Sequence, residues 1–176
     1  MLYLEKETNL RYATSLCGEG IFLEFGVSTG YSINYLADFC PTRKIYGFDS
    51  FEGLPQPWYN HSKGAFKTAG PPQVRENVEL IIGMFEDTIP PFIASHPERI
   101  ALVHIDCDLY ESTKCVFDNL EDRLLPGTML VFDEYHRYNG YEQHEYKAFK
   151  EFIERTKRPF EFMAMSNAEQ VSVILL

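Results

Sequence analysis

The chain has 176 residues, 45% of them hydrophobic and 24% charged, which is the composition of an ordinary globular domain with a sizeable core. Its formal net charge of -10 argues against a general nucleic-acid binder or a protein that binds anionic membranes, since either would carry a basic patch. No apolar stretch reaches the roughly 18–20 residues of a membrane span, and the first ten residues lack a secretory signal pattern. We therefore expect one cytoplasmic domain over residues 1–176, with no nucleic-acid or membrane partner.

The apolar pattern predicts seven strands. A short helix within residues 9–17 precedes them, and helix-like segments follow the first, fourth and fifth. The first five runs are rich in β-forming residues, and the last two read as an antiparallel pair around a short polar turn. The predicted strands are 21–27, 44–50, 78–84, 101–106, 128–133, 159–165 and 170–176.

Nearly continuous apolar strands that alternate with helices are typical of a mainly parallel sheet that helices cover on both faces. The pattern therefore predicts a doubly wound α/β fold. Residues 51–77 interrupt the alternation, because they are rich in proline, glycine and aromatic residues where a crossover helix is expected. We expect this segment to be a functional or flexible loop.

The first turn after a strand reads Glu24-x-Gly26-x-x-x-Gly30. Glycines at such a turn let the backbone approach a ligand, and the following helix start offers free N–H groups. Ser28 stands where a dinucleotide-binding turn has its middle glycine, which disfavours a pyrophosphate site. Asp49 ends the second strand, about twenty residues further on, where a carboxylate can hold a ribose diol. The alternative is that Asp49 only caps a turn with Ser50.

Acidic residues also follow the fourth and fifth strands: Asp106 and Asp108, then the pair Asp133-Glu134. If these strands are neighbours, their ends meet at one edge of the sheet, and the carboxylates repel one another unless a cation binds them. Oxygen ligands suit magnesium, calcium or manganese. The alternative is that these acids cap helices or pair with Arg or Lys.

Six motifs together resemble the macrocin O-methyltransferase family, over roughly residues 20–155. They are E-x-G-x-x-x-G, GFDSFEGLP, GMFEDTIP, HIDCDLYEST, LLPGTMLVFDEY and HEYKAF. The resemblance implies S-adenosylmethionine (SAM) and a divalent cation, usually Mg²⁺, as cofactors. It implies transfer of a methyl group to a hydroxyl of a sugar or another small-molecule natural product. It also implies a Rossmann-like seven-stranded sheet with the last strand antiparallel.

Carried over residue by residue, the resemblance assigns three groups of residues. Those at SAM are Glu24, Gly26, Ser28, Thr29, Gly30, Asp49, Ser50, Phe51, Gly83, Phe85, Asp87 and Asp106. Those at the metal are Asp106, Asp133 and Glu134, the last where relatives often have Asp. Asp106 is also the expected acceptor of the hydroxyl proton.

Several other residues keep two interpretations. Asp108 either supports the site or caps the next helix. His104 is expected to be a hydrogen-bonded core histidine, and His136 a loop residue. Three aromatic residues of the long loop either line an acceptor pocket or pack the loop onto the sheet: Trp58, Tyr59 and His61.

Two features of the resemblance leave alternatives open. Relatives carry a longer N-terminal region over the active site, so here the 51–77 loop or a second subunit of a homodimer would cover it, or the site is open to a large substrate. A SAM- or metal-binding module without catalysis is the main alternative function. The sequence Asp106-Cys107-Asp108 also fits, less well, the D-x-D motif of nucleotide-sugar glycosyltransferases or of phosphatases.

Overall fold

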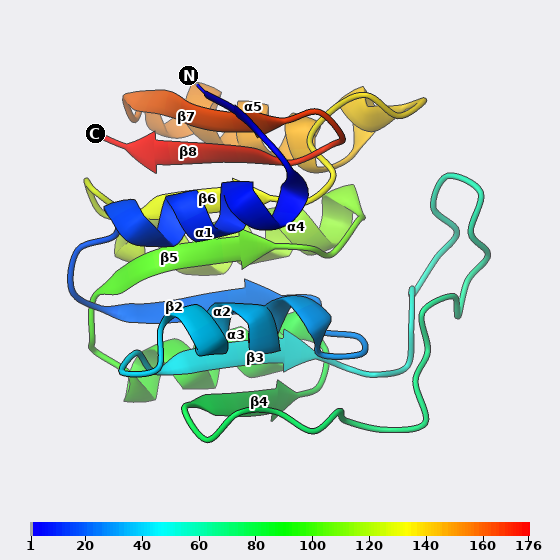
Figure 1. Cartoon of the computed structure of the whole chain (residues 1–176). Coiled ribbons are helices and arrows are strands. Elements are labelled where there is room, and N and C mark those ends of the chain that lie inside the picture. Colours follow the sequence, from blue (N-terminus) through cyan, green and yellow to red (C-terminus); the bar gives the residue numbers. More distant parts are fainter. Residues whose placement is uncertain (1) are drawn as a thin grey trace.

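One eight-stranded sheet runs through the molecule, as the computed structural model describes it over residues 2–176 (Figure 1). Along the sheet the strands follow the order β1-β7-β8-β6-β5-β2-β3-β4. Only β8 runs against its two neighbours, β6 and β7. The strands are β1 (Leu2–Leu4), β2 (Ile21–Phe25), β3 (Ile45–Asp49), β4 (Val78–Ile82), β5 (Ile100–Ile105), β6 (Met129–Phe132), β7 (Phe160–Ser166) and β8 (Val171–Leu175). The predicted α/β fold, mostly parallel with an antiparallel last strand, is confirmed.

The structure adds one strand to the seven that the pattern predicts. β1 has three residues, lies at the edge of the sheet and pairs in parallel with β7, with Leu2 opposite Ala164. Its first two residues are exposed, so the segment has no buried apolar run from which a strand could be predicted.

Five helices cover the two faces of the sheet. α1 and α2 lie on one face, and α3, α4 and α5 lie on the other (Figure 1). Each face has its own cluster of buried apolar side chains. Within residues 2–176, no helix is both long and apolar enough to span a membrane. The helices are α1 (Lys6–Leu16), α2 (Tyr31–Phe39), α3 (Phe85–Ser95), α4 (Tyr110–Leu120) and α5 (Glu145–Thr156).

α3 is absent from the sequence prediction because Pro90 and Pro91 lie inside it. Proline removes a backbone donor and normally ends a helix. Here Ile89 and Phe92 are buried against the sheet, and the acidic first turn suits the positive end of the helix dipole. Tertiary packing therefore outweighs the local cost of the two prolines.

The 51–77 segment is a loop, as predicted. It contains an isolated bridge between Trp58 and His61 and extends beyond the carboxyl ends of the strands (Figure 1). Its return to the sheet is fixed on α2, where Arg75 makes two hydrogen bonds to Asp38, of 2.6 and 2.9 Å. Asn34 accepts a further bond from the Arg75 backbone. The loop is therefore anchored where it rejoins the fold.

Candidate functional site

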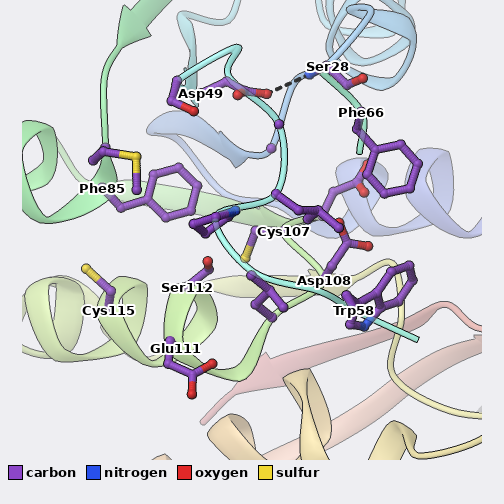
Figure 2. Close-up of a pocket in the computed structure, with 18 of the residues that line it drawn as sticks. Ser28, Asp49, Trp58, Phe66, Phe85, Cys107, Asp108, Glu111, Ser112 and Cys115 are labelled. Atoms are coloured by element: carbon purple, nitrogen blue, oxygen red, sulfur yellow. Dashed lines mark hydrogen bonds between the residues drawn. The ribbon is translucent and has the colours of Figure 1, made fainter. Parts of the chain in front are cut away.

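A cavity of about 520 Å³ opens at the carboxyl ends of β2, β3, β5 and β6. Figure 2 shows Asp49 and Ser28 at one end of it, Phe85 and Cys115 on one side, and Trp58 and Phe66 on the other. This is the edge at which ligands of doubly wound sheets bind. Nine of the residues proposed from the sequence line the cavity: Gly26, Ser28, Asp49, Ser50, Gly83, Phe85, Asp106, Asp133 and Glu134.

The other five proposed residues do not line the cavity: Glu24, Thr29, Gly30, Phe51 and Asp87. Glu24 is fully buried and lies in a hydrogen-bonded chain behind the cavity wall. Its carboxylate accepts a 2.9 Å bond from Ser32 Oγ, and its other oxygen lies 2.8 Å from His104 Nδ1. Glu24 therefore ties β2 to α2 and β5. The prediction that His104 is a hydrogen-bonded core histidine is confirmed, with 1% of its surface exposed.

Gly26 lets two strand ends approach each other closely. Its φ is +95°, and a Cβ atom there would lie 1.7 Å from the backbone oxygen of Asp106. Only glycine fits at such a point, because any side chain would collide with backbone that cannot move aside. The first glycine of the motif is therefore required to bring Asp106 beside the first turn.

Asp49 shapes the same turn from the next strand. One of its oxygens accepts bonds from the N–H groups of Val27 and Ser28, at 2.8 and 2.7 Å. The other accepts a 2.7 Å bond from the N–H of Phe51. Asp49 thus caps a turn, though through Val27, Ser28 and Phe51 rather than Ser50, and the carboxylate also lines the cavity with one lone pair left.

The structure brings two of the predicted metal ligands, Asp106 and Asp133, together, and the third residue of that group is His104 rather than Glu134. β5 and β6 are neighbours, and the Asp133 N–H bonds the Ile105 carbonyl one residue before Asp106. Burial and the negative charge of Asp133 raise the pKa of both Asp106 and Glu134 well above their usual range. Asp133 is the ionised member of the cluster: burial opposes its charge, but the positive charges of His104 and Lys6 hold its pKa below the usual range.

Three ligand atoms of this cluster lie within 4.8 Å of one another, contributed by His104, Asp106 and Asp133. Asp133 Oδ1 and Glu134 Oε2 are buried without a hydrogen-bond partner. Buried carboxylate oxygens left unpaired are costly unless a cation binds them. The donor set, oxygens with one imidazole nitrogen, suits a divalent cation.

Lys6 reaches the cluster from the start of α1. Its Nζ lies 2.5 Å from Asp133 Oδ2. Burial lowers the pKa of Lys6, but the charge of Asp133 and the hydrogen bond to it raise that pKa above its usual value. The sequence analysis did not identify this residue, and no local signal points to it, since the contact joins positions 127 apart in the chain.

Two further acids belong to the cluster. Burial and the charge of Asp133 raise the pKa of Asp108 to about 7, and Asp108 lines the cavity beside Trp58 (Figure 2). It does not cap α4, whose N-cap is Leu109, with no side-chain bond. Glu145, fully buried, accepts a 3.1 Å bond from the Glu134 N–H, while its Oε1 has no partner. Glu145 lies in the HEYKAF motif, but its approach to Glu134 depends on the tertiary fold.

Aromatic side chains close one side of the cavity. Trp58 and Phe66 line it, and Trp58 packs edge-on against Tyr138, with ring centroids 5.6 Å apart. His61 stacks on Trp58 at 5.6 Å. Trp58 is 8% exposed, whereas Tyr59 is 52% exposed. Of the three predicted aromatic residues only Trp58 lines the cavity, while His61 packs on Trp58 and Tyr59 is exposed, so Tyr59 and His61 do not line it.

Comparison with known proteins places this arrangement in context. The profile of a family described as a methyltransferase domain matches residues 23–135. The chain is 29% identical over 164 residues to a tetracenomycin-derivative 4'-O-methyltransferase of Streptomyces olivaceus, and the match covers 77% of this chain. The match spans 62% of the length of that relative.

Two solved structures share the fold. The calicheamicin methyltransferase CalS11 superimposes with a TM-score of 0.76 at 24% identity, over 94% of this chain and 76% of CalS11. The O-methyltransferase NovP superimposes with a TM-score of 0.73 at 20% identity, over 96% of this chain and 78% of NovP.

Proposed function

The chain belongs to the methyltransferase domain family, and from that premise we propose that it is a SAM-dependent O-methyltransferase. The acceptor is a hydroxyl of a sugar or another small natural product, as the name of the Streptomyces relative suggests. One observation carries the proposal. A single cavity joins the Gly26–Asp49 turn to the Asp106–Asp133–Glu134 cluster, so that a cofactor and an acceptor fit side by side.

The turn side of the cavity would take SAM, which supplies an electrophilic methyl group when bound. Asp49 lines this side and accepts three backbone bonds, which leaves one lone pair for a ribose hydroxyl, and Gly26 and Ser28 line it where the methionine part would lie. Phe85 and Gly83 would flank the adenine. Glu24 would act indirectly, because it holds the turn through its hydrogen bonds to Ser32 and His104 and does not line the cavity.

The acid side would take the acceptor and a divalent cation, Mg²⁺ or another. Asp106, Asp133 and Glu134 would hold the ion, and His104 would be a further ligand only after loss of its Nε2 proton. When bound, such an ion lowers the pKa of a coordinated hydroxyl. The donor set fits this role because two of its buried oxygens lack partners.

The hydroxyl proton needs an acceptor that faces the cavity. Asp106 is the acceptor that the sequence proposes, and it lies between the turn and the cluster. Asp108 is a second candidate from the structure, because its pKa of about 7 suits a base near neutral pH. Asp108→Asn separates the two, because Asp108 is not among the proposed metal ligands: loss of activity with retained metal binding identifies Asp108 as the proton acceptor, and retained activity leaves Asp106 in that role.

The main alternative is a SAM- or metal-binding module without catalysis. The methyltransferase and the non-catalytic module can both bind SAM, so the test needs two stages, one for binding and one for methyl transfer. Calorimetric titration with SAM, and with NADH as a control ligand, tests the cofactor. We expect SAM to bind, and Asp49→Ala to weaken it at least about tenfold. Asp122→Ala, a change in the turn after α4, is the matched control. Absence of SAM binding would reject the proposal.

The second stage measures transfer of radiolabelled methyl groups to sugars with vicinal diols. We expect transfer that EDTA abolishes and added Mg²⁺ restores. Full activity in EDTA would remove the metal from the mechanism while leaving the methyltransferase in place. SAM binding with no transfer to a broad acceptor panel would favour the non-catalytic module.

A further inference from the structure

Lys6 occupies the position at the acid cluster where a cation is needed. Its Nζ lies 2.5 Å from Asp133 Oδ2, and Asp133 is 3% exposed. Within the described part of the chain, Lys6 is the only Lys or Arg that lines the cavity. Its positive charge also acts on Asp106 and Glu134. One ammonium therefore pairs with Asp133 and lies close enough to act on Asp106 and Glu134, the three acids that would hold a divalent cation.

An ammonium and a metal ion at this carboxylate oppose each other. Lys6 Nζ holds Asp133 Oδ2, and Oδ1, which has no hydrogen-bond partner, is the oxygen open to an ion that binds carboxylate oxygen at about 2.1 Å. Two cations bound to one carboxylate at such distances repel each other strongly in a site shielded from water. Either the lysine withdraws or the ion binds weakly.

The local structure allows the lysine to withdraw. Lys6 is the first residue of α1, and the side chain of the N-cap residue Glu5 makes no capping bond. Leu10 and Ala13 are buried further along the helix and hold it on the sheet. The Lys6 side chain is 42% exposed, so rotation of its flexible stem carries the ammonium into solvent without moving α1.

We propose that Lys6 is an internal counter-ion that competes with a divalent cation for Asp133 and is expelled into solvent when the ion binds. In the absence of metal the ion pair neutralises Asp133 and keeps the cluster folded. The inference rests on the metal site of the proposed function, but it does not depend on methyl transfer.

The first test compares metal affinity among variants of the full chain. Mn²⁺ and Mg²⁺ are titrated calorimetrically into the unmodified protein, Lys6→Met, Lys6→Arg and Lys44→Met. Lys44, an exposed residue just before β3, lies at the opposite edge of the strands and is the matched control. We expect Lys6→Met to bind metal about tenfold more tightly, because the competing charged hydrogen bond is gone. Lys6→Arg and Lys44→Met should stay close to the parent.

The second test needs no substitution and so does not depend on the folding of a variant. Lysines of the unmodified protein are acetylated briefly with and without Mg²⁺, and the rate at each site is measured by mass spectrometry. We expect Mg²⁺ to accelerate acetylation of Lys6 severalfold and to leave Lys44 unchanged.

The outcomes separate this inference from the proposed function. Two results would overturn the competition: equal metal affinity in the parent and Lys6→Met, or acetylation of Lys6 that metal does not accelerate. Either result leaves the methyltransferase proposal intact. A failure of every variant to bind metal overturns both the metal site and the competition. SAM binding, which is measured separately, then still decides whether the chain is a methyltransferase.

Discussion

Individual residues of this fold both hold the backbone in place and line the candidate site. Gly26 brings the first turn against the backbone of Asp106, and Asp49 holds that turn by three backbone bonds while facing the cavity. Such positions tolerate little change, because one substitution disturbs both the turn and the site.

Gly26→Ala should destabilise the protein far more than an alanine at another glycine with positive φ. We expect a loss of at least about 3 kcal/mol in the free energy of unfolding, from backbone strain and collision with Asp106. Gly64→Ala is the matched control, since Gly64 has φ +84° and no atom within 4 Å of a built Cβ; it should cost about 1 kcal/mol. Urea unfolding curves measure the free energy of unfolding of both variants. Equal losses would show that the close approach to Asp106 contributes nothing.

Glu24 should behave as a structural residue. Glu24→Ala leaves the buried His104 and Ser32 without partners, and we expect it to lower the free energy of unfolding by about 3–5 kcal/mol. Ser32→Ala, which removes one neutral partner, should cost about 1–3 kcal/mol. Thermal and urea unfolding test whether Glu24→Ala loses more stability than Ser32→Ala. If Glu24→Ala kept parental stability but lost SAM binding, Glu24 would act directly on the cofactor.

At the scale of elements, the sequence predicts well what depends on local pattern. The apolar runs predict every strand with a buried core, and Pro- and Gly-rich composition predicts the 51–77 loop. β1 and α3 are missed, because β1 is short and exposed and α3 contains two prolines that only tertiary packing can accommodate. In the site, the motifs predict the turn and the three acids. Lys6 and Glu145 are missed because no local pattern specifies a contact across the fold.

The anchor of the long loop gives a test at this scale. The hydrogen bonds from Arg75 lower the pKa of Asp38. A lowered pKa means that the pair stabilises the fold above the ordinary Asp value of about 4 and is lost as the pH falls through the lower, folded value. NMR titration should find the Asp38 pKa below that ordinary value, and Arg75→Gln should restore it. Lys63→Gln, in the exposed part of the loop, should leave it unchanged. An Asp38 pKa that Arg75→Gln did not raise would contradict the anchor.

At the scale of the whole molecule, stability should decrease from the centre of the sheet to its edges. All residues of β2 and β5 are buried, whereas β4 and β1 lie at opposite edges and are partly exposed. Hydrogen exchange measured by mass spectrometry should find amides of β2 and β5 exchanging only through global unfolding, and those of β1 and β4 through cheaper local opening. Uniform protection across the sheet would contradict this gradient.

The pairing of β1 with β7 also fixes the order in which the molecule is completed during synthesis. Leu2 lies opposite Ala164, so the first strand leaves the ribosome long before its partner exists. Contacts between such distant segments form late in folding, because closing a long loop of chain is slow. Lys6 lies two residues after β1 and pairs with Asp133, which is also synthesised much later. The nascent chain therefore carries β1 without its partner strand until β7 has emerged.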